Sequence, residues 1–198
     1  ELMTLFSMPL VLHNGSEVSR EASIKYLGYS TLGAALALMG FFILSLNAAS
    51  LEFAAGGVEL LGGDKNRLLV ACFLIVLGFG AKAGLVPLQM WLTEAHPVAP
   101  SPASAVLSGL ITKGGVIAII RSVFYLFGAD FVKGSWVQTA VLTLAVITIF
   151  FGSMLAYREK LLKKRLAYST ISQVSYALLG LLLLSTQGVL GALLQIVF

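Results

Sequence analysis

Two lysines lie inside long apolar stretches of this sequence. Lys82 is well inside the stretch 68–92, and Lys113 is near the middle of the stretch 104–127. A lysine that faces lipid at mid-bilayer costs at least ~2.5–3.5 kcal/mol, so both side chains are expected to face a bundle interior, a partner or water. A buried ammonium group can lose its proton near neutral pH. Two such residues on consecutive stretches therefore favour a proton-conducting path, with a static ion pair as the alternative.

A carboxylate and a proline stand where they could act on Lys82. Glu1 opens the apolar stretch 1–12 and is the candidate partner, unless it is an interfacial residue at a helix end. Pro87 follows Lys82 by five residues. A proline inside a helix removes the donor for the carbonyl four residues earlier, here that of Ala83. We therefore expect a broken helix near Pro87, beside Lys82, with a passive kink as the alternative.

Hydroxyl and amide side chains accompany these charges at helical spacing. Ser108 and Thr112 form a stripe next to Lys113, and Ser172 and Gln173 belong to a polar stripe in the later stretch 167–185. Such stripes can hold water, but they can equally form hydrogen bonds between helices. Arg121 is also deep, although it lies closer to a predicted helix end, where a long side chain can reach the interface.

The elements that must position these residues are membrane-spanning helices. The chain is 58% hydrophobic and 11% charged, whereas a soluble domain has roughly 45–50% apolar and about 25% charged residues. Its apolar stretches are continuous rather than alternating, and each is long enough to cross a ~30 Å hydrocarbon core as a helix. This predicts an all-α, polytopic transmembrane helix bundle. We expect five full spans at residues 26–46, 68–92, 104–127, 136–157 and 167–185, with truncated spans at 1–12 and from Gly188.

The basic residues predict how this bundle is oriented. The net charge of +4 comes mainly from the cluster 158–165, which lies between two apolar stretches. Cytoplasmic loops are enriched in Lys and Arg, so the loop 157–166 is predicted to be cytoplasmic. Alternation along the chain places the loop 13–25, with Arg20 and Lys25, on the same side. The charge is therefore interpreted as a topology signal, and we expect no nucleic-acid partner.

Several other features give no support for a cofactor or metal. Cys72 has no second cysteine with which to form a disulfide or a thiolate site. The letters of residues 78–83 match a dinucleotide fingerprint, but they lie inside an apolar stretch and not between a strand and a helix. His13 and His96 are predicted to be isolated loop residues without metal-ligand spacing. We expect no cofactor in this chain and no redox chemistry of its own.

Three segments carry a resemblance to a known family. They are AKAGLVPLQMWLTEAH at residues 81–96, PSPASAVLSG at 100–109 followed by Lys113, and KKRLAYSTISQ at 163–173. The sequence resembles the proton-conducting antiporter-like membrane subunits. These comprise the pumping subunits of NADH:quinone oxidoreductase (respiratory complex I), subunits of Mrp-type sodium/proton antiporters and membrane subunits of energy-converting hydrogenases.

The resemblance implies roles for the charged residues. Glu1 corresponds to the glutamate of the family's fifth helix, Lys82 to the lysine of the broken seventh helix and Lys113 to the lysine of the eighth. In the family the first two form an ion pair whose making and breaking shifts the lysine's proton affinity, and the third passes the proton toward the central axis. Two departures weaken the match. Leu161 stands where relatives often have an acidic residue, and Gln195 stands where many have a histidine.

The whole chain is accordingly expected to be part of a longer membrane domain. We expect residues 1–198 to belong to a proton-translocating subunit of a redox-driven complex resembling NADH:quinone oxidoreductase, in the cell inner membrane. The expected partners are other membrane subunits, the lipid bilayer and protons, with sodium left open. The alternatives are a subunit of an Mrp-type antiporter, a subunit of an energy-converting hydrogenase, and a non-conducting scaffold.

Overall fold

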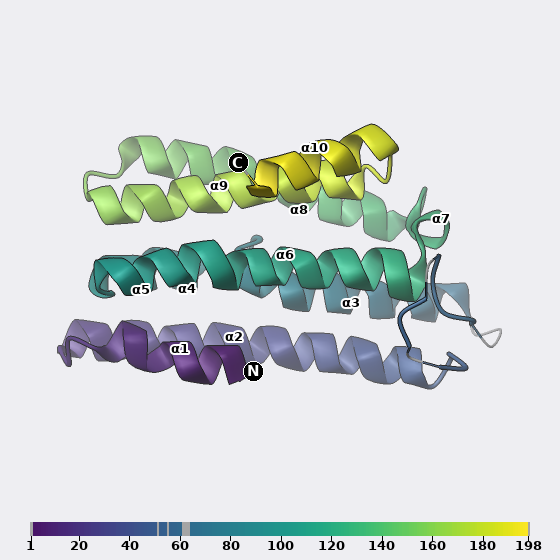
Figure 1. Cartoon of the computed structure of the whole chain (residues 1–198), viewed down its shortest axis with the longest axis horizontal. Coiled ribbons are helices and arrows are strands. Elements are labelled where there is room, and N and C mark those ends of the chain that lie inside the picture. Colours follow the sequence, from purple (N-terminus) through teal and green to yellow (C-terminus); the bar gives the residue numbers. More distant parts are fainter. Residues whose placement is uncertain (1, 51, 55, 61–63, 198) are drawn as a thin grey trace.

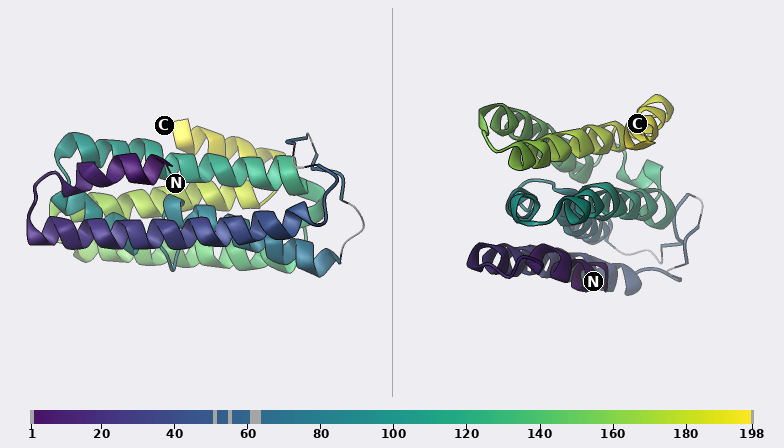
Figure 2. Two further views of the ribbon diagram at one scale, coloured as in Figure 1. Left: turned by 90° about the horizontal axis from the view of Figure 1, so that it is seen from below. Right: turned by 60° about the vertical axis from the view of Figure 1, so that its left-hand side comes forward.

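A computed structural model describes residues 2–50, 52–54, 56–60 and 64–197 of the chain. The helices run roughly along one common axis and form three layers (Figures 1 and 2). The first layer holds α1 (Leu2–Leu12) and α2 (Glu17–Ser45). The middle layer holds α3 (Lys65–Ala83), α4 (Met90–Val98) and a continuous helical segment made of α5 (Ser101–Val106), η1 (Leu107–Ile111), α6 (Thr112–Arg121) and η2 (Ser122–Phe127). After the short α7 (Ala129–Val132), the third layer holds α8 (Trp136–Arg158), α9 (Leu162–Leu182) and α10 (Thr186–Val197).

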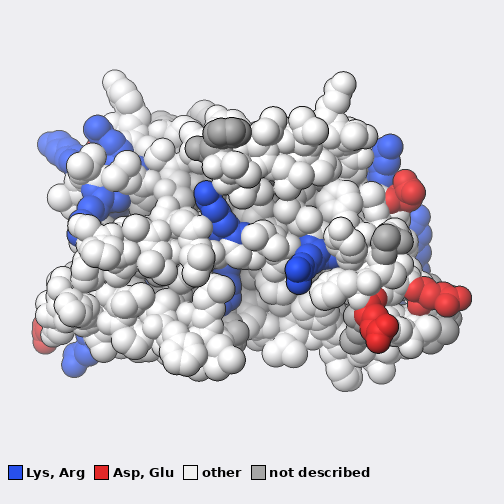
Figure 3. All heavy atoms as spheres, in the orientation of Figure 1, with Lys and Arg blue, Asp and Glu red and all other residues white. Residues whose placement is uncertain are grey.

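The predicted all-α membrane bundle is confirmed. Within the described residues, four helical segments are long and apolar enough to cross a membrane: Glu17–Ser45, Lys65–Ala83, Ser101–Phe127 and Trp136–Arg158. The sequence also predicts a span at 167–185, but α9 is not among these segments, and it carries the polar stripe. Large apolar side chains such as Phe42 and Phe150 are exposed. The face shown in Figure 3 is mostly uncharged, with charged side chains gathered at its two ends and a few Lys or Arg side chains near its centre.

Short polar side chains cap the N-termini of the long helices α2 and α3. The hydroxyl of Ser16 accepts from the Ser19 backbone N–H (3.1 Å) at the start of α2. The carboxylate of Asp64 accepts from the Asn66 N–H (3.2 Å) at the start of α3. Each cap satisfies a backbone donor that has no partner inside the helix. The polar turns of the sequence therefore set where the apolar helices begin.

The predicted break near Pro87 is present, but Gly84 rather than Pro87 ends the helix. Gly84 has φ +89°, a left-handed conformation that closes α3, and its N–H donates to the Gly80 carbonyl (2.9 Å). Pro87 lies in the connection between α3 and α4, where its ring is exposed. The predicted broken helix is therefore confirmed, and the alternative of a passive kink at Pro87 is not observed, because α3 already ends at Ala83, four residues before the proline.

Glycine at position 115 lets α6 lie directly against the end of α3. A Cβ atom at Gly115 would be 2.8 Å from the Ala83 backbone nitrogen and 2.9 Å from the Phe79 carbonyl oxygen. Real Cβ atoms do not approach backbone this closely. The helices that bear Lys82 and Lys113 are thus in backbone contact, two residues from Lys113 and one from Lys82.

The connections α1–α2, α4–α5 and α8–α9 meet at one end of the bundle, which we call the basic end (Figure 1). There the Asn14 side-chain amide donates to the Val98 carbonyl and the Lys163 ammonium donates to the Ala99 carbonyl, both at 2.9 Å. The two basic loops therefore lie on the same side, as predicted. Both are shorter than predicted, because α2 already begins at Glu17 and only residues 159–161 separate α8 from α9.

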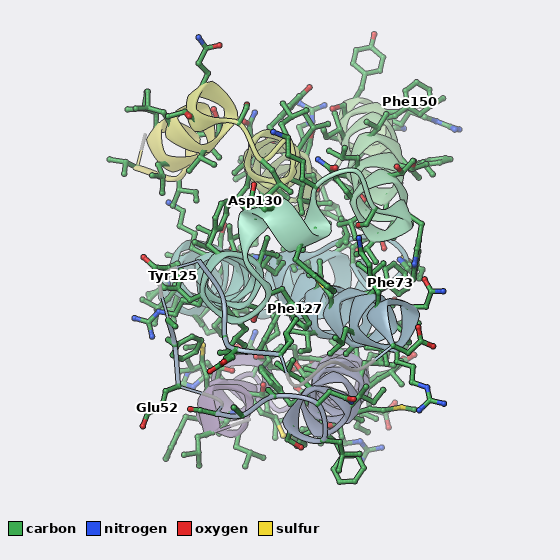
Figure 4. All side chains as sticks on the ribbon, turned by 90° about the vertical axis from the view of Figure 1, so that its right-hand side faces the viewer. Glu52, Phe73, Tyr125, Phe127, Asp130 and Phe150 are labelled. Carbon is green, nitrogen blue, oxygen red and sulfur yellow. The ribbon has the colours of Figure 1, made fainter. Side chains whose placement is uncertain are left out.

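The opposite end is closed by irregular chain. The backbone N–H of Ala54 donates to the Tyr125 carbonyl (3.2 Å), and that of Val58 donates to the Leu126 carbonyl (2.9 Å). Figure 4 looks onto this end, with Phe127 toward the middle of the bundle and Glu52 at its edge. These contacts hold the connection after α2 against the end of η2.

Candidate proton-transfer site

Lys82 lies in the last turn of α3 and is partly buried. Its ammonium group donates a hydrogen bond to the hydroxyl of Thr4 on α1, a side chain with no exposed surface. Glu1, the expected partner of Lys82, lies outside the described residues. The described contacts therefore connect Lys82 to the first layer of the bundle through Thr4.

A second pair of hydroxyl groups continues from Thr4 into α2. The Ser7 hydroxyl donates to the Thr4 carbonyl (3.1 Å) and lies 2.6 Å from the Tyr26 hydroxyl. Since Ser7 has one hydroxyl proton, the Tyr26 hydroxyl donates to Ser7 when Ser7 donates to Thr4. Thr4, Ser7 and Tyr26 are all buried. A buried, hydrogen-bonded set of hydroxyls is suited to hold an ammonium group in a defined position.

The broken helix also contributes to the walls around Lys82. The indole N–H of Trp91, on α4, donates to the Ala81 carbonyl (2.8 Å), which the end of α3 leaves without a helical donor. The ring of Trp91 packs against that of Tyr26 with the centroids 4.8 Å apart. The break at Gly84 therefore brings α4 back over the final turn of α3, beside the lysine.

Lys113 has different surroundings. Its ammonium group donates to the Ile196 carbonyl of α10 (2.9 Å). It also faces a cavity of about 350 Å³ between α6, α9 and α10. The polar residues that line this cavity are Ser108, Lys113, Ser169, Thr170, Gln173 and Gln195. We call it the Lys113 cavity. Its volume and polar lining satisfy the requirements for holding water.

The predicted supporting residues divide between this cavity and the packed interior. Ser108 and Gln173 line it, and the Gln173 amide oxygen accepts from the Gln195 amide (2.6 Å). Thr112 instead points inward and donates to the Ser108 carbonyl (2.6 Å). The Ser172 hydroxyl lies 2.9 Å from the Ser153 hydroxyl of α8. Ser172 therefore forms a hydrogen bond between helices, which was the alternative to holding water.

A π-helical segment before Lys113 was not foreseen. The segment η1, Leu107–Ile111, interrupts the α-helical repeat immediately before α6. A π turn contains more residues than an α turn, so side chains on either side of it no longer follow one stripe. This accounts for Ser108 facing the cavity while Thr112 faces the interior. Periodicity in a sequence assumes a constant repeat and does not reveal such a turn.

His96 is not the isolated loop residue that the sequence suggested. It lies in α4 with 3% of its surface exposed, and its Nδ1 is hydrogen-bonded to the Ser104 hydroxyl of α5. The helix extends past the residue because Pro97 is accommodated within it. A signal was present in the sequence, since Trp91, Leu92 and Ala95 form an apolar face at helical spacing that continues to position 96.

The remaining reactive residues add no metal-ligand cluster. Among the residues described, no group of three or more His, Cys, Asp or Glu side chains comes together. Arg121 places its guanidinium 5.9 Å from the Phe53 ring centroid, near the opposite end. The arrangement that the structure describes can exchange protons between amine, hydroxyl and imidazole groups.

Comparison with known proteins shows which family of membrane subunits this chain resembles. The family model described as "NADH:quinone oxidoreductase/Mrp antiporter, TM" matches residues 1–198. Hydrogenase-4 component B of Escherichia coli is 32% identical over 205 residues, covering 98% of this chain and 30% of that protein. An Na⁺/H⁺ antiporter subunit of Alkalihalophilus pseudofirmus is 31% identical over 198 residues, covering 98% and 39%. The NAD(P)H-quinone oxidoreductase chain 4 of Trichormus variabilis is 31% identical over 185 residues, covering 92% and 34%.

Solved structures have the same fold. A chain of the Mrp complex from Dietzia sp. gives a TM-score of 0.78 at 25% identity, covering 96% of this chain and 35% of that one. A chain of respiratory complex I from Thermus thermophilus gives 0.72 at 25% identity, covering 88% and 37%. The chain thus spans between 30% and 39% of the length of these relatives.

Proposed function

Since this chain belongs to the NADH:quinone oxidoreductase/Mrp antiporter family of membrane subunits, we propose that it forms the part of a proton-translocating subunit in which protons pass by way of Lys82 and Lys113. The observation that supports this most directly is the placement of the two lysines. They lie on helices in backbone contact at Gly115, Lys82 bonded to the buried Thr4 hydroxyl and Lys113 facing a polar cavity.

Lys113 is the relay residue of this proposal. Its acceptor is the backbone carbonyl of Ile196, which accepts a hydrogen bond but carries no charge to hold the ammonium permanently. The side chains of Gln173 and Gln195 are likewise neutral. Water in a cavity with this lining can receive a proton from Lys113 and return one to it. An ion-pair anchor would instead be expected beside a carboxylate, and no salt bridge between described residues includes Lys113.

Lys82 is the residue that loads Lys113, with the Glu1 carboxylate as its partner. The support for this pairing is the resemblance of residues 81–96 to the broken-helix segment of the family. We propose that the redox centres and the remaining helices of the pathway belong to the rest of the protein and to partner subunits, and that this chain holds no cofactor. The membrane is the cell inner membrane, with the basic end cytoplasmic.

A second candidate is a subunit of a sodium/proton antiporter without a redox partner. The relatives named above from a hydrogenase, an antiporter and a quinone oxidoreductase are equally similar to this chain, at 32%, 31% and 31% identity. Neighbouring genes separate these candidates. Genes for flavin and iron–sulfur subunits favour redox coupling, and genes for small antiporter subunits favour exchange. Proton flux that requires sodium in the medium would support the antiporter.

The test of the function uses two variants of Lys113 in the full-length protein within its complex. A relay must release its proton, whereas arginine keeps its charge at physiological pH. Lys113→Arg and the smaller, neutral Lys113→Gln should both assemble and both lose proton translocation in sealed vesicles. Because Gln is smaller, it controls for the bulk of arginine. Proton flux at the parent level in an assembled Lys113→Arg complex would contradict the proposal.

The orientation has its own test. Residues 159–161 connect α8 and α9 at the basic end, and Lys160 is exposed there. A cysteine introduced as Lys160→Cys should react with an impermeant thiol reagent only after the cytoplasmic face is opened. Labelling of intact cells from outside would reverse the assignment. The buried Cys72 serves as the internal control that stays unlabelled.

A further inference from the structure

The basic end contains a buried histidine whose second nitrogen has no partner among the described residues. Nδ1 of His96 is bonded to the Ser104 hydroxyl. Its Nε2 is buried and accepts or donates no hydrogen bond within the described part of the chain. Leaving a buried polar group unsatisfied costs about 1–3 kcal/mol. A hydrogen bond that only holds α4 against α5 requires Nδ1 alone. The buried Nε2 without a partner therefore needs another explanation.

This histidine lines a second cavity of about 360 Å³, between α4, α5 and α9. We call it the His96 cavity. Its polar lining consists of His96, Ser101, Ser104, Ser108, Lys163 and Thr170. Ser101 is exposed at the start of α5, and Lys163 binds the Ala99 carbonyl at the basic end. The cavity therefore extends inward from the basic end.

The two cavities adjoin each other. Ser108, Leu166 and Thr170 line both of them. At this boundary the hydroxyls of Ser108 and Thr170 are 3.2 Å apart, and either can act as donor. Polar, proton-exchanging groups thus follow one another from His96 through Ser104 and this hydroxyl pair to Lys113.

We propose that His96 admits protons from the basic end into the Lys113 cavity, along a route that does not pass Lys82. The inference rests on the proposed function and adds a second entrance to it. A proton binds to the lone pair of Nε2, and the Nδ1 proton moves to the Ser104 hydroxyl, whose own proton passes to the next hydroxyl or water. Only N–H and O–H bonds form and break, and the imidazole returns to the neutral form by exchanging its tautomer.

The hydroxyl pair joins two different helices, which explains how this entrance can be closed to protons. Ser108 and Thr170 come from different helices, η1 and α9, so a small separation of these helices breaks their bond. The π-helical turn at Leu107–Ile111 places Ser108 at the boundary. Contact between the two cavities therefore depends on how α9 sits against this turn.

The experiment compares two histidines of the same protein. His96→Gln keeps a polar side chain that can bond Ser104 but cannot carry a proton, and His13→Gln changes an exposed residue in the α1–α2 connection. Both are made in the full-length protein, and proton flux is measured in sealed vesicles after assembly is verified. His96→Gln should lower the flux by about 1.5- to 2-fold, far less than the ~10²–10⁴-fold of a sole proton-transfer group, because the entrance through Lys82 remains. His13→Gln should leave it unchanged.

A rescue measurement distinguishes a His96 that carries protons from a His96 that only connects α4 to α5. In His96→Ala, imidazole added on the cytoplasmic side should restore flux, because it can occupy the space and exchange protons. It should have no effect on the parent. Parent flux in His96→Gln, or reduced flux that imidazole does not restore, would overturn the inference. If Lys113→Gln abolishes flux while His96→Gln leaves it at the parent level, the entrance is refuted and the proposed function stands.

Discussion

The surroundings of Lys82 and Lys113 differ in how tightly they enclose an ammonium group. Lys82 lies in the last turn of α3, where the helix is broken, and its ammonium group donates to the buried Thr4 hydroxyl. Lys113 lies in an uninterrupted helical segment and faces a cavity of about 350 Å³. A tightly packed site defines the position of a charge, and a roomy polar site lets a proton leave through water. Under the proposed function, the comparison teaches that the surroundings of Lys82 suit holding a proton and those of Lys113 suit passing it on.

The largest effect is expected when the tightly packed site loses its amine. Lys82→Ala in the full-length protein should reduce proton translocation by about two- to threefold, less than the ~10²–10⁴-fold of a sole proton-transfer group, because protons that enter at His96 do not pass Lys82. Assembly should survive because Lys82 is only partly buried. Proton flux in sealed vesicles measures the effect, and amounts of assembled complex provide the control. Flux equal to that of the parent would remove Lys82 from the path.

A change at the contact between the two regions is expected to disturb both. Gly115→Ala places a methyl group 2.8 Å from the Ala83 backbone, so α6 and α3 must separate. Such overpacking typically costs about 1–3 kcal/mol. Melting temperature and flux should both fall. Gly28→Ala is the matched control, because a methyl group there meets nothing within 4 Å. Equal behaviour of the two variants would show that the close contact is unimportant.

Removing one hydroxyl should affect Lys82 and leave Lys113 intact. Thr4→Val keeps the shape of the side chain and removes the acceptor of the Lys82 ammonium. A hydrogen bond to a charged group contributes about 1.5–3 kcal/mol. We expect a partial loss of flux without loss of assembly. Thr31→Val is the control, since Thr31 is exposed on α2 and its hydroxyl bonds to Leu27 in its own helix. A flux that does not respond to Thr4→Val would show that Thr4 does not position the lysine.

The smallest effect concerns the basic end outside the membrane segments. The Leu161 backbone N–H, with help from Lys164 and the Lys160 N–H, lowers the pKa of the Glu159 carboxyl. A lowered pKa in the folded protein stabilises it above the unfolded pKa, and this contribution is lost as the pH falls through the folded value. Glu159→Gln should therefore lower the melting temperature slightly near pH 7 and not at low pH. The exposed Glu52, at the opposite end (Figure 4), provides Glu52→Gln as control. A difference between parent and Glu159→Gln that stays constant with pH would contradict this.

Much of the site was visible in the residue types. A lysine in an apolar stretch is too costly to face lipid, so Lys82 and Lys113 stood out before any contact was known. Ser108 and Gln173 were identifiable from helical spacing and line one cavity with Lys113, whereas Thr112, predicted in the same stripe as Ser108, faces the interior. His96 was misjudged, because the nearby Pro97, Pro100 and Pro102 suggested a loop where α4 continues.

The amino-acid sequence by itself determined the class of fold, the helices and the residues able to exchange protons, because hydrophobicity and charge act locally and at fixed spacing. Tertiary structure decided what each residue contacts. It turned Ser172 toward α8, placed Pro87 in an exposed connection after Gly84 had ended the helix, and joined His96 to Ser104. Those outcomes depend on which helices approach closely and on a π turn that changes their register, and neither can be read from the spacing of residues along one chain.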